Sequence, residues 1–127
     1  MREILFRGKD FSGVLSHSWI FGSLDTTEKE YPSIIYLDRF GNRCRIFVNP
    51  KTVGQYTGLT DKNGKKIFEN DIVKIKGKTR YIFYGSSGFR HTNYGEYADT
   101  LEKVFTVVDC EVIGNIYDNP ELLEVKE

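Results

Sequence analysis

The chain has 127 residues with 18 basic and 18 acidic side chains, so it carries no net charge and has the length of one ordinary domain. Its 9 Val, 11 Ile, 9 Thr and 18 aromatic residues face a single Ala, a single Met and a single Gln, which excludes a helical bundle, a coiled coil and low-complexity disorder. No run approaches the roughly 18 apolar residues of a membrane helix, and the polar N-terminus lacks an apolar segment of signal-peptide length, so we expect a cytoplasmic protein with no membrane partner.

The first half of the chain predicts short strands separated by turns. The strands are expected at residues 2–7, 14–22, 34–37 and 43–48. The second should place Trp19 and Phe21 on one face. The turn at 38–42 joins the last two into a hairpin with one buried face, and Pro50 ends it because proline donates no ladder hydrogen bond.

The second half begins with the strongest turn signal in the chain, Asn63-Gly64, which predicts another hairpin. Further strands are expected at residues 72–76, 80–84, 104–108 and 111–117, the last with a bulge or a close backbone approach at Gly114. The glycine-rich stretch 85–97 predicts a long loop, while 98–103 fits either a helical turn or a strand. Asn119 as N-cap and Pro120 as first helical residue predict a short helix at the end.

Together these signals predict an all-β fold, a small barrel or sandwich of short antiparallel strands with one short C-terminal helix. About eight strands at a spacing of roughly 8–12 residues favour this architecture over alternating α/β units. Residues 1–127 show no linker and no internal repeat, so we expect a single domain.

Charge and cysteine usage bound the compartment and the partners. Cys44 and Cys110 are most simply two buried thiols in a reducing compartment, although their spacing also permits a disulfide. The charge balance is +2 over residues 1–60, +5 over 61–90 and −7 over 91–127. The basic and acidic blocks either neutralise each other, within one sheet or between subunits, or form a selective surface for a polyanion; we favour neutralisation.

Patterns for known catalytic and metal sites are tested and rejected. Gly58 and Gly64-Lys65 have the wrong spacing for a phosphate-binding loop, and Asp61 to Lys65 places its glycine too early for a calcium loop. His17, His91 and the two cysteines are too scattered to suggest zinc, and no nucleophile elbow accompanies Ser16 or either histidine. The carboxylate pairs near the C-terminus fit a solvated face. We expect no enzyme activity, no cofactor and no metal.

One functional signal remains, a run of basic side chains that alternate with apolar ones across a predicted hairpin. Tyr81 and Phe83 lie close enough in sequence to offer stacking surfaces, as single-strand binders use. Outward lysines also protect sheet edges from pairing, which is the simpler reading. The candidate nucleic-acid-binding residues are Lys62, Lys65, Lys66, Lys74, Lys76, Lys78 and Arg80.

Three stretches of the chain resemble the YopX family of bacteriophage and prophage proteins. They are residues 1–9 with the tryptophan-containing segment 18–24, residues 52–74, and residues 110–123. The family usually has glycine where this chain has Asn70, and since asparagine also tolerates positive φ, the turn should survive. Residues 25–47 and 77–109 carry no such likeness. The resemblance implies a phage- or prophage-encoded protein of a bacterial cytoplasm, and it supplies neither an activity nor catalytic residues.

The sequence therefore predicts a non-enzymatic phage accessory protein that acts by protein–protein contact, with self-association as the expected mode and a phage or host protein as another possible partner. Opposed charge blocks, many short strands and an aromatic content of 14% support this function. The alternative is a nucleic-acid-binding module that uses the basic segment 62–80.

Overall fold

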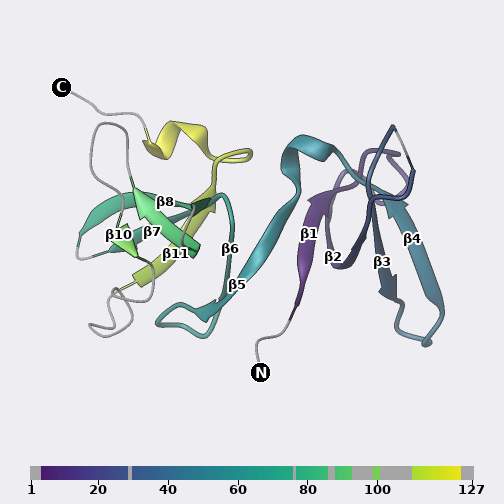
Figure 1. Ribbon diagram of the computed structural model, residues 1–127, viewed down its shortest axis with the longest axis horizontal. Helices are drawn as coiled ribbons and strands as arrows, with labels where there is room; N and C mark the ends of the chain where they lie inside the picture. The colour runs from purple at the N-terminus through teal and green to yellow at the C-terminus, as the bar shows by residue number, and fades with distance from the viewer. Residues whose placement is uncertain are drawn as a thin grey trace. The chain divides into compact units, whose positions relative to one another are not determined.

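The computed structural model describes residues 4–28, 30–75, 77–85, 88–92, 99–100 and 110–123. Antiparallel strands dominate this part of the chain, as predicted (Figure 1). The strands are β1 (Phe6–Lys9), β2 (Trp19–Asp25), β3 (Ser33–Leu37), β4 (Arg43–Phe47), β5 (Gly54–Thr60), β6 (Lys66–Phe68), β7 (Asp71–Ile75), β8 (Lys78–Gly85), β9 (Gly88–Thr92), β10 (Asp99–Thr100) and β11 (Cys110–Asn115). Two 3₁₀ turns, η1 (Pro50–Thr52) and η2 (Pro120–Leu123), complete the described elements.

The chain divides into two compact units, Met1–Tyr56 and Thr57–Glu127, with the boundary inside β5. Among the described residues, each unit has its own hydrophobic core cluster. That both units fold together as the single domain expected over residues 1–127 stays a prediction.

In the first unit the strand order is β4-β3-β2-β1-β5, and these strands pair in antiparallel fashion. Ile20, Ile34 and Val48 form the core on one face, because alternate residues of neighbouring strands point to the same side. The predicted β3–β4 hairpin is confirmed, with Ile34 opposite Ile46 and alternating exposure along β4.

The predicted second strand begins later than expected. Residues 14–17 form a turn instead, and Ser16 and His17 adopt φ values of 57° and 58°. The carboxylate of Asp10 organises this turn, since it accepts hydrogen bonds from the backbone N–H groups of Ser12 and Leu15 and from the Ser12 hydroxyl. These bonds, led by the Ser12 hydroxyl, lower the pKa of Asp10 to about 2.

In the second unit β6 follows β5, and a five-stranded sheet has the order β10-β9-β8-β7-β11. Its core cluster joins Ile67, Val73, Ile75, Ile82 and Cys110. The predicted Asn63-Gly64 turn between β5 and β6 is confirmed, with Gly64 at φ 81°. Asn70 has φ 73°, so it does replace glycine in the turn before β7.

The prediction of a continuous loop over residues 85–97 is wrong. Residues 88–92 form β9, which pairs with β8 through Tyr84 opposite Phe89 and Gly85 opposite Gly88. Glycines at a tight hairpin end explain the loop-like composition. The strand predicted at 104–108 lies outside the described residues.

The C-terminal prediction is half right. The bulge at Gly114 is confirmed, because the register with β7 shifts between Val112 and Gly114. The predicted helix is only the 3₁₀ turn η2, in which the Leu122 N–H donates to the Asn119 carbonyl oxygen. The side-chain oxygen of Asn119 accepts the N–H of Asn115, and an added Cβ on Gly114 would lie 2.5 Å from this oxygen.

The fold prediction offered a small barrel or a sandwich. Neither sheet closes into a barrel within the described strands. None of the described helical turns has the length and apolar character of a membrane span.

Candidate functional site

The first unit turns one face of β2, β3 and β4 away from its core, and we call this surface the outer face. It carries apolar side chains that are unusually open to solvent, because Phe21 is 46% exposed, Leu37 69% and Phe47 42%. Cross-strand neighbours on this face pair Leu37 with Arg43 and Ile35 with Arg45. Exposed apolar side chains interspersed with arginines are typical of protein–protein contact surfaces.

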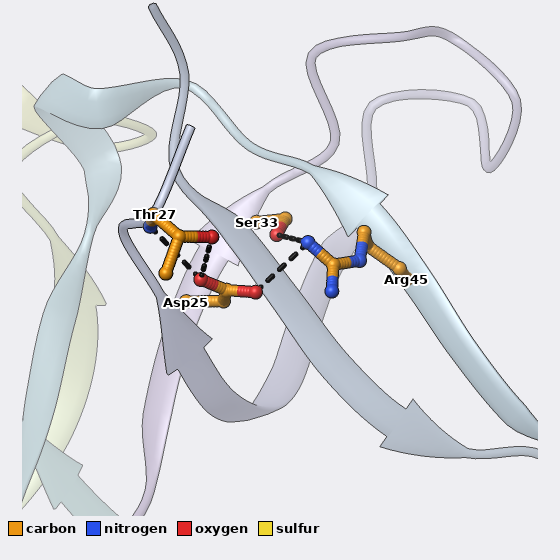
Figure 2. Close-up of polar contacts among 4 residues, drawn as sticks. All are labelled: Asp25, Thr27, Ser33 and Arg45. Atoms are coloured by element: carbon orange, nitrogen blue, oxygen red, sulfur yellow. Dashed lines mark hydrogen bonds and ion pairs between the residues drawn. The ribbon is translucent and has the colours of Figure 1, made fainter. Parts of the chain in front are cut away.

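A polar cluster ties the three strands of the outer face together (Figure 2). The Arg45 guanidinium lies 2.8 Å from the carboxylate of Asp25 and donates to the Ser33 hydroxyl at 3.4 Å. The backbone N–H and hydroxyl of Thr27 donate to the other oxygen of Asp25. These two Thr27 bonds, followed by Arg45, lower the pKa of Asp25, so the carboxylate stays ionised and neutralises Arg45.

An open pocket of about 680 Å³ adjoins this cluster at the Ser33 end of β3. Its lining combines two carboxylates with two aromatic rings, and consists of Thr27, Glu28, Glu30, Tyr31 and Phe47. Phe11 stacks on Tyr31 with ring centroids 4.8 Å apart, and its N–H donates to the carbonyl oxygen of Phe47. Carboxylates beside aromatic rings favour a cationic group with an apolar body.

The other end of β3 leads into the turn that joins it to β4. Asp38 shapes this turn, because its Oδ1 accepts the N–H groups of Phe40 and Asn42 at 2.9 Å each. These backbone bonds, Asn42 first, lower the pKa of Asp38. At the tip, the Arg39 guanidinium lies 4.9 Å from the centre of the Phe40 ring, and Phe40 is 75% exposed. The β3–β4 hairpin therefore has an acidic, aromatic end and a cationic, aromatic end.

The same turn recurs between β5 and β6, where its tip has a partner. Asp61 Oδ1 accepts the N–H groups of Asn63 and Lys65, and the Gly64 N–H donates to the Asp61 carbonyl oxygen, as Gly41 does to Asp38. Here, however, Asp61 Oδ2 also accepts the Val112 N–H at 2.9 Å. Burial acts to raise the pKa of Asp61, but these three N–H donors outweigh it and lower the pKa.

The candidate basic residues do not gather on one face. On the β7–β8 hairpin Val73 lies opposite Arg80, Lys74 opposite Thr79, and Ile75 opposite Lys78. By alternation Lys74 therefore lies on one face, and Lys78 and Arg80 on the other. Arg80 is only 7% exposed.

The acidic block meets the basic segment at Glu111. Its carboxylate lies 3.9 Å from the Lys62 ammonium, and it sits in register with Lys74. This contact agrees with the favoured interpretation, that the basic and acidic blocks neutralise each other. Lys65 and Lys66 are exposed around the β5–β6 turn, and Lys76 lies outside the described residues.

The remaining sequence candidates show no site. Cys44 and Cys110 are free thiols, and the described residues contain no cluster of His, Cys, Asp and Glu able to hold a metal. His17 is exposed, and its Nδ1 lies 3.0 Å from the carbonyl oxygen of Asp10, a backbone contact rather than a catalytic one. The side chain of His91 lies outside the described set.

Sequence reasoning missed the pocket and the turn tip. Residues 25–30 are all polar in sequence and carry no signal of a pocket. The proximity of Thr27, Glu28 and Glu30 to Phe47 depends on strand pairing, which composition does not reveal. A signal for the tip was present, because Phe40 is an aromatic residue in a turn otherwise built from Asp, Arg, Gly and Asn.

These features define a small antiparallel β protein whose first unit presents an apolar surface with oppositely charged ends. The chain belongs to the YopX protein family, whose match covers residues 14–124 and confirms the resemblance. The match begins after residues 1–9 and includes 25–47 and 77–109, where the sequence showed no likeness. Among solved structures, protein EF1440 from Enterococcus faecalis is similar in fold, with a TM-score of 0.59 and 23% identity over 98% of this chain and 100% of that one. No curated protein matches.

Proposed function

We propose that this YopX-family protein is a non-enzymatic accessory protein that acts by protein–protein contact, through self-association of the outer face. The observation that carries the proposal is the set of exposed apolar side chains that the first unit presents. Among the residues whose burial the structure describes, ten large apolar side chains stand out as exposed, and the eight in the first unit are Ile4, Phe11, Val14, Phe21, Tyr31, Leu37, Phe40 and Phe47. Surfaces of this kind usually mark interaction sites.

A second copy is the occupant that the charges favour. Glu28 and Glu30 lie at one end of the β3–β4 hairpin, and Arg39 and Arg43 lie at the other. A two-fold axis through the middle of the outer face brings each acidic end against the cationic end of the other copy. Such a self-complementary patch is what an isologous dimer requires.

The phage or prophage origin and the cytoplasmic location are part of the same proposal. Family membership supports the first. The second is supported by Cys44 and Cys110, which are free thiols as expected in a reducing compartment.

Light scattering coupled to size exclusion tests the proposed self-association. We expect a mass that is a multiple of 14.7 kDa, and a shift toward the monomer in Leu37→Ser, whose side chain is 69% exposed on the outer face. Leu122→Ser, in the second unit, is the matched control because Leu122 is also an exposed leucine, at 37%. Equal effects of both substitutions would contradict the choice of surface.

A further inference from the structure

We propose that the pocket beside Tyr31 and Phe47 receives the Arg39–Phe40 turn tip of a second copy, and that the second copy's pocket receives the tip in return. This inference rests on the proposed self-association and names the residues that make the contact. It assigns a binding site, the pocket, and a ligand of stated chemistry, a guanidinium stacked on a phenyl ring.

The pocket suits this ligand in charge and in shape. Glu28 and Glu30 supply the carboxylates for a guanidinium, and Tyr31 and Phe47 supply rings for an aromatic side chain. Its volume of about 680 Å³ falls within the roughly 300–1,000 Å³ of pockets that enclose small ligands. The nearby Arg45 does not oppose a cation strongly, because Asp25 is paired with it at 2.8 Å.

The turn tip is exposed and has a fixed backbone, as insertion into a pocket requires. Arg39 and Phe40 already stack on each other at 4.9 Å, so little freedom is left to lose when they enter a pocket together. Asp38 fixes the backbone beneath them through its two N–H acceptor bonds. Yet Phe40 is 75% exposed, which among the described large apolar side chains only Ile4 equals.

The second turn of the same type shows that such a tip can be docked. At the β5–β6 turn, the residue that corresponds to Arg39 is Lys62, whose N–H donates to the Cys110 carbonyl oxygen at 2.9 Å. The residue that corresponds to Phe40 is Asn63, whose amide lies 3.5 Å from the Glu111 carboxylate. One turn thus meets an acidic partner within its own unit, while the other presents a cation and a ring to solvent.

The spacing of the two ends permits reciprocal contacts. The tip and the pocket lie at opposite ends of β3, whose five residues span about 16 Å as an extended strand. With the outer faces of two copies opposed about a two-fold axis, the tip of each copy reaches the pocket of the other. Leu37 and Phe21 of both copies then lie between the two tip-and-pocket contacts. The dimer then covers apolar and charged groups at once.

Charge reversal and its repair test the contact. We expect Arg39→Glu alone, and Glu28→Arg with Glu30→Arg, each to raise the Kd for self-association at least about tenfold. Combining all three changes should restore the Kd to within about threefold of the parent, because the ion pairs re-form with reversed sign. Lys51→Glu, an exposed cation in the same unit, is the control and should have no such effect.

Sedimentation equilibrium on the full chain gives the Kd of each variant, and the far-UV spectrum reports whether each is folded. Should Arg39→Glu fail to fold, Arg39→Gln and Phe40→Ser provide the same test, with an expected loss of at least about fivefold. Self-association that persists in the single variants, or that the combined variant does not restore, would overturn the tip-and-pocket contact alone. A parent that stays monomeric would overturn the proposed function, and this contact with it.

Discussion

Replacement of Asp61 measures how strongly the β5–β6 turn is anchored to the rest of its unit. Its Oδ1 accepts two N–H groups within the turn, and its Oδ2 accepts the Val112 N–H of β11. Asp61→Asn keeps the first oxygen but places an NH₂ group against the Val112 N–H, so two donors face each other. We expect a loss of about 1–3 kcal/mol in the free energy of unfolding, the cost of one unsatisfied, partly buried donor.

Asp61→Ala should cost more, because all three donors lose their acceptor. Asn63 and Lys65 are exposed, so water replaces the carboxylate there at about 0.5–1.5 kcal/mol each, and Val112 adds about 1–3 kcal/mol. The sum, about 2–6 kcal/mol, is a large share of the stability of a small protein, typically about 5–15 kcal/mol.

Asp38→Asn is the matched control, since the Oδ1 of Asp38 alone accepts both turn N–H groups. Its Oδ2 accepts no backbone N–H but only the Asn42 amide at 3.4 Å and the Cys44 thiol at 3.9 Å. An amide oxygen can keep both backbone bonds, so we expect a change within about 0.5 kcal/mol. Urea denaturation followed by circular dichroism gives the three values. If Asp61→Asn and Asp38→Asn were equally mild, the bond to Val112 would not anchor the turn.

Three further predictions concern other parts of the molecule. Gly22→Ala should destabilise the first unit by more than about 2 kcal/mol, because the new Cβ would lie 2.2 Å from the Ile35 carbonyl oxygen. In Gly41→Ala, the control, the new Cβ meets no atom within 4 Å, so the substitution should cost only about 1–2 kcal/mol for its φ of +83°. Thermal melts compare the two variants. The pKa of Asp10 is lowered from 3.8 to about 2, so the ionised carboxylate contributes fully to the free energy of unfolding above about pH 4, and this contribution is lost as the pH falls toward 2. Asp10→Asn should therefore flatten the dependence of the urea midpoint on pH in this range. An unchanged slope would contradict the dependence of the turn on the ionised carboxylate. If the basic segment does bind duplex DNA, its exposed Lys65, Lys66, Lys74 and Lys78 should give a log–log salt slope of about −3 to −4, but we expect no retention at about 50 mM salt.

Local signals in the sequence predicted much of the fold because they act over a few residues. Asn63-Gly64 and the alternation over residues 43–48 each specify a hairpin through backbone preferences and one buried face, and the structure confirms both. Gly114 was also predictable, since a glycine inside a strand pattern usually marks a bulge or a close approach.

Contacts between distant residues were beyond these signals. Asn119 has the sequence of an N-cap, but its amide is used by Asn115 across the bulge. Arg80 fits an outward basic stripe, yet its register opposite Val73 places it on the buried face. The pocket likewise depends on the β3–β4 register, which brings Phe47 opposite Ser33 and so beside the loop that precedes β3.

The mass of the parent protein in solution tests the central claim, that the outer face joins two copies, most directly. Light scattering coupled to size exclusion at about 100 μM detects any self-association with a Kd in the micromolar range. The account predicts a mass of at least twice 14.7 kDa that falls toward 14.7 kDa in Arg39→Glu. A parent of 14.7 kDa at this concentration would contradict it.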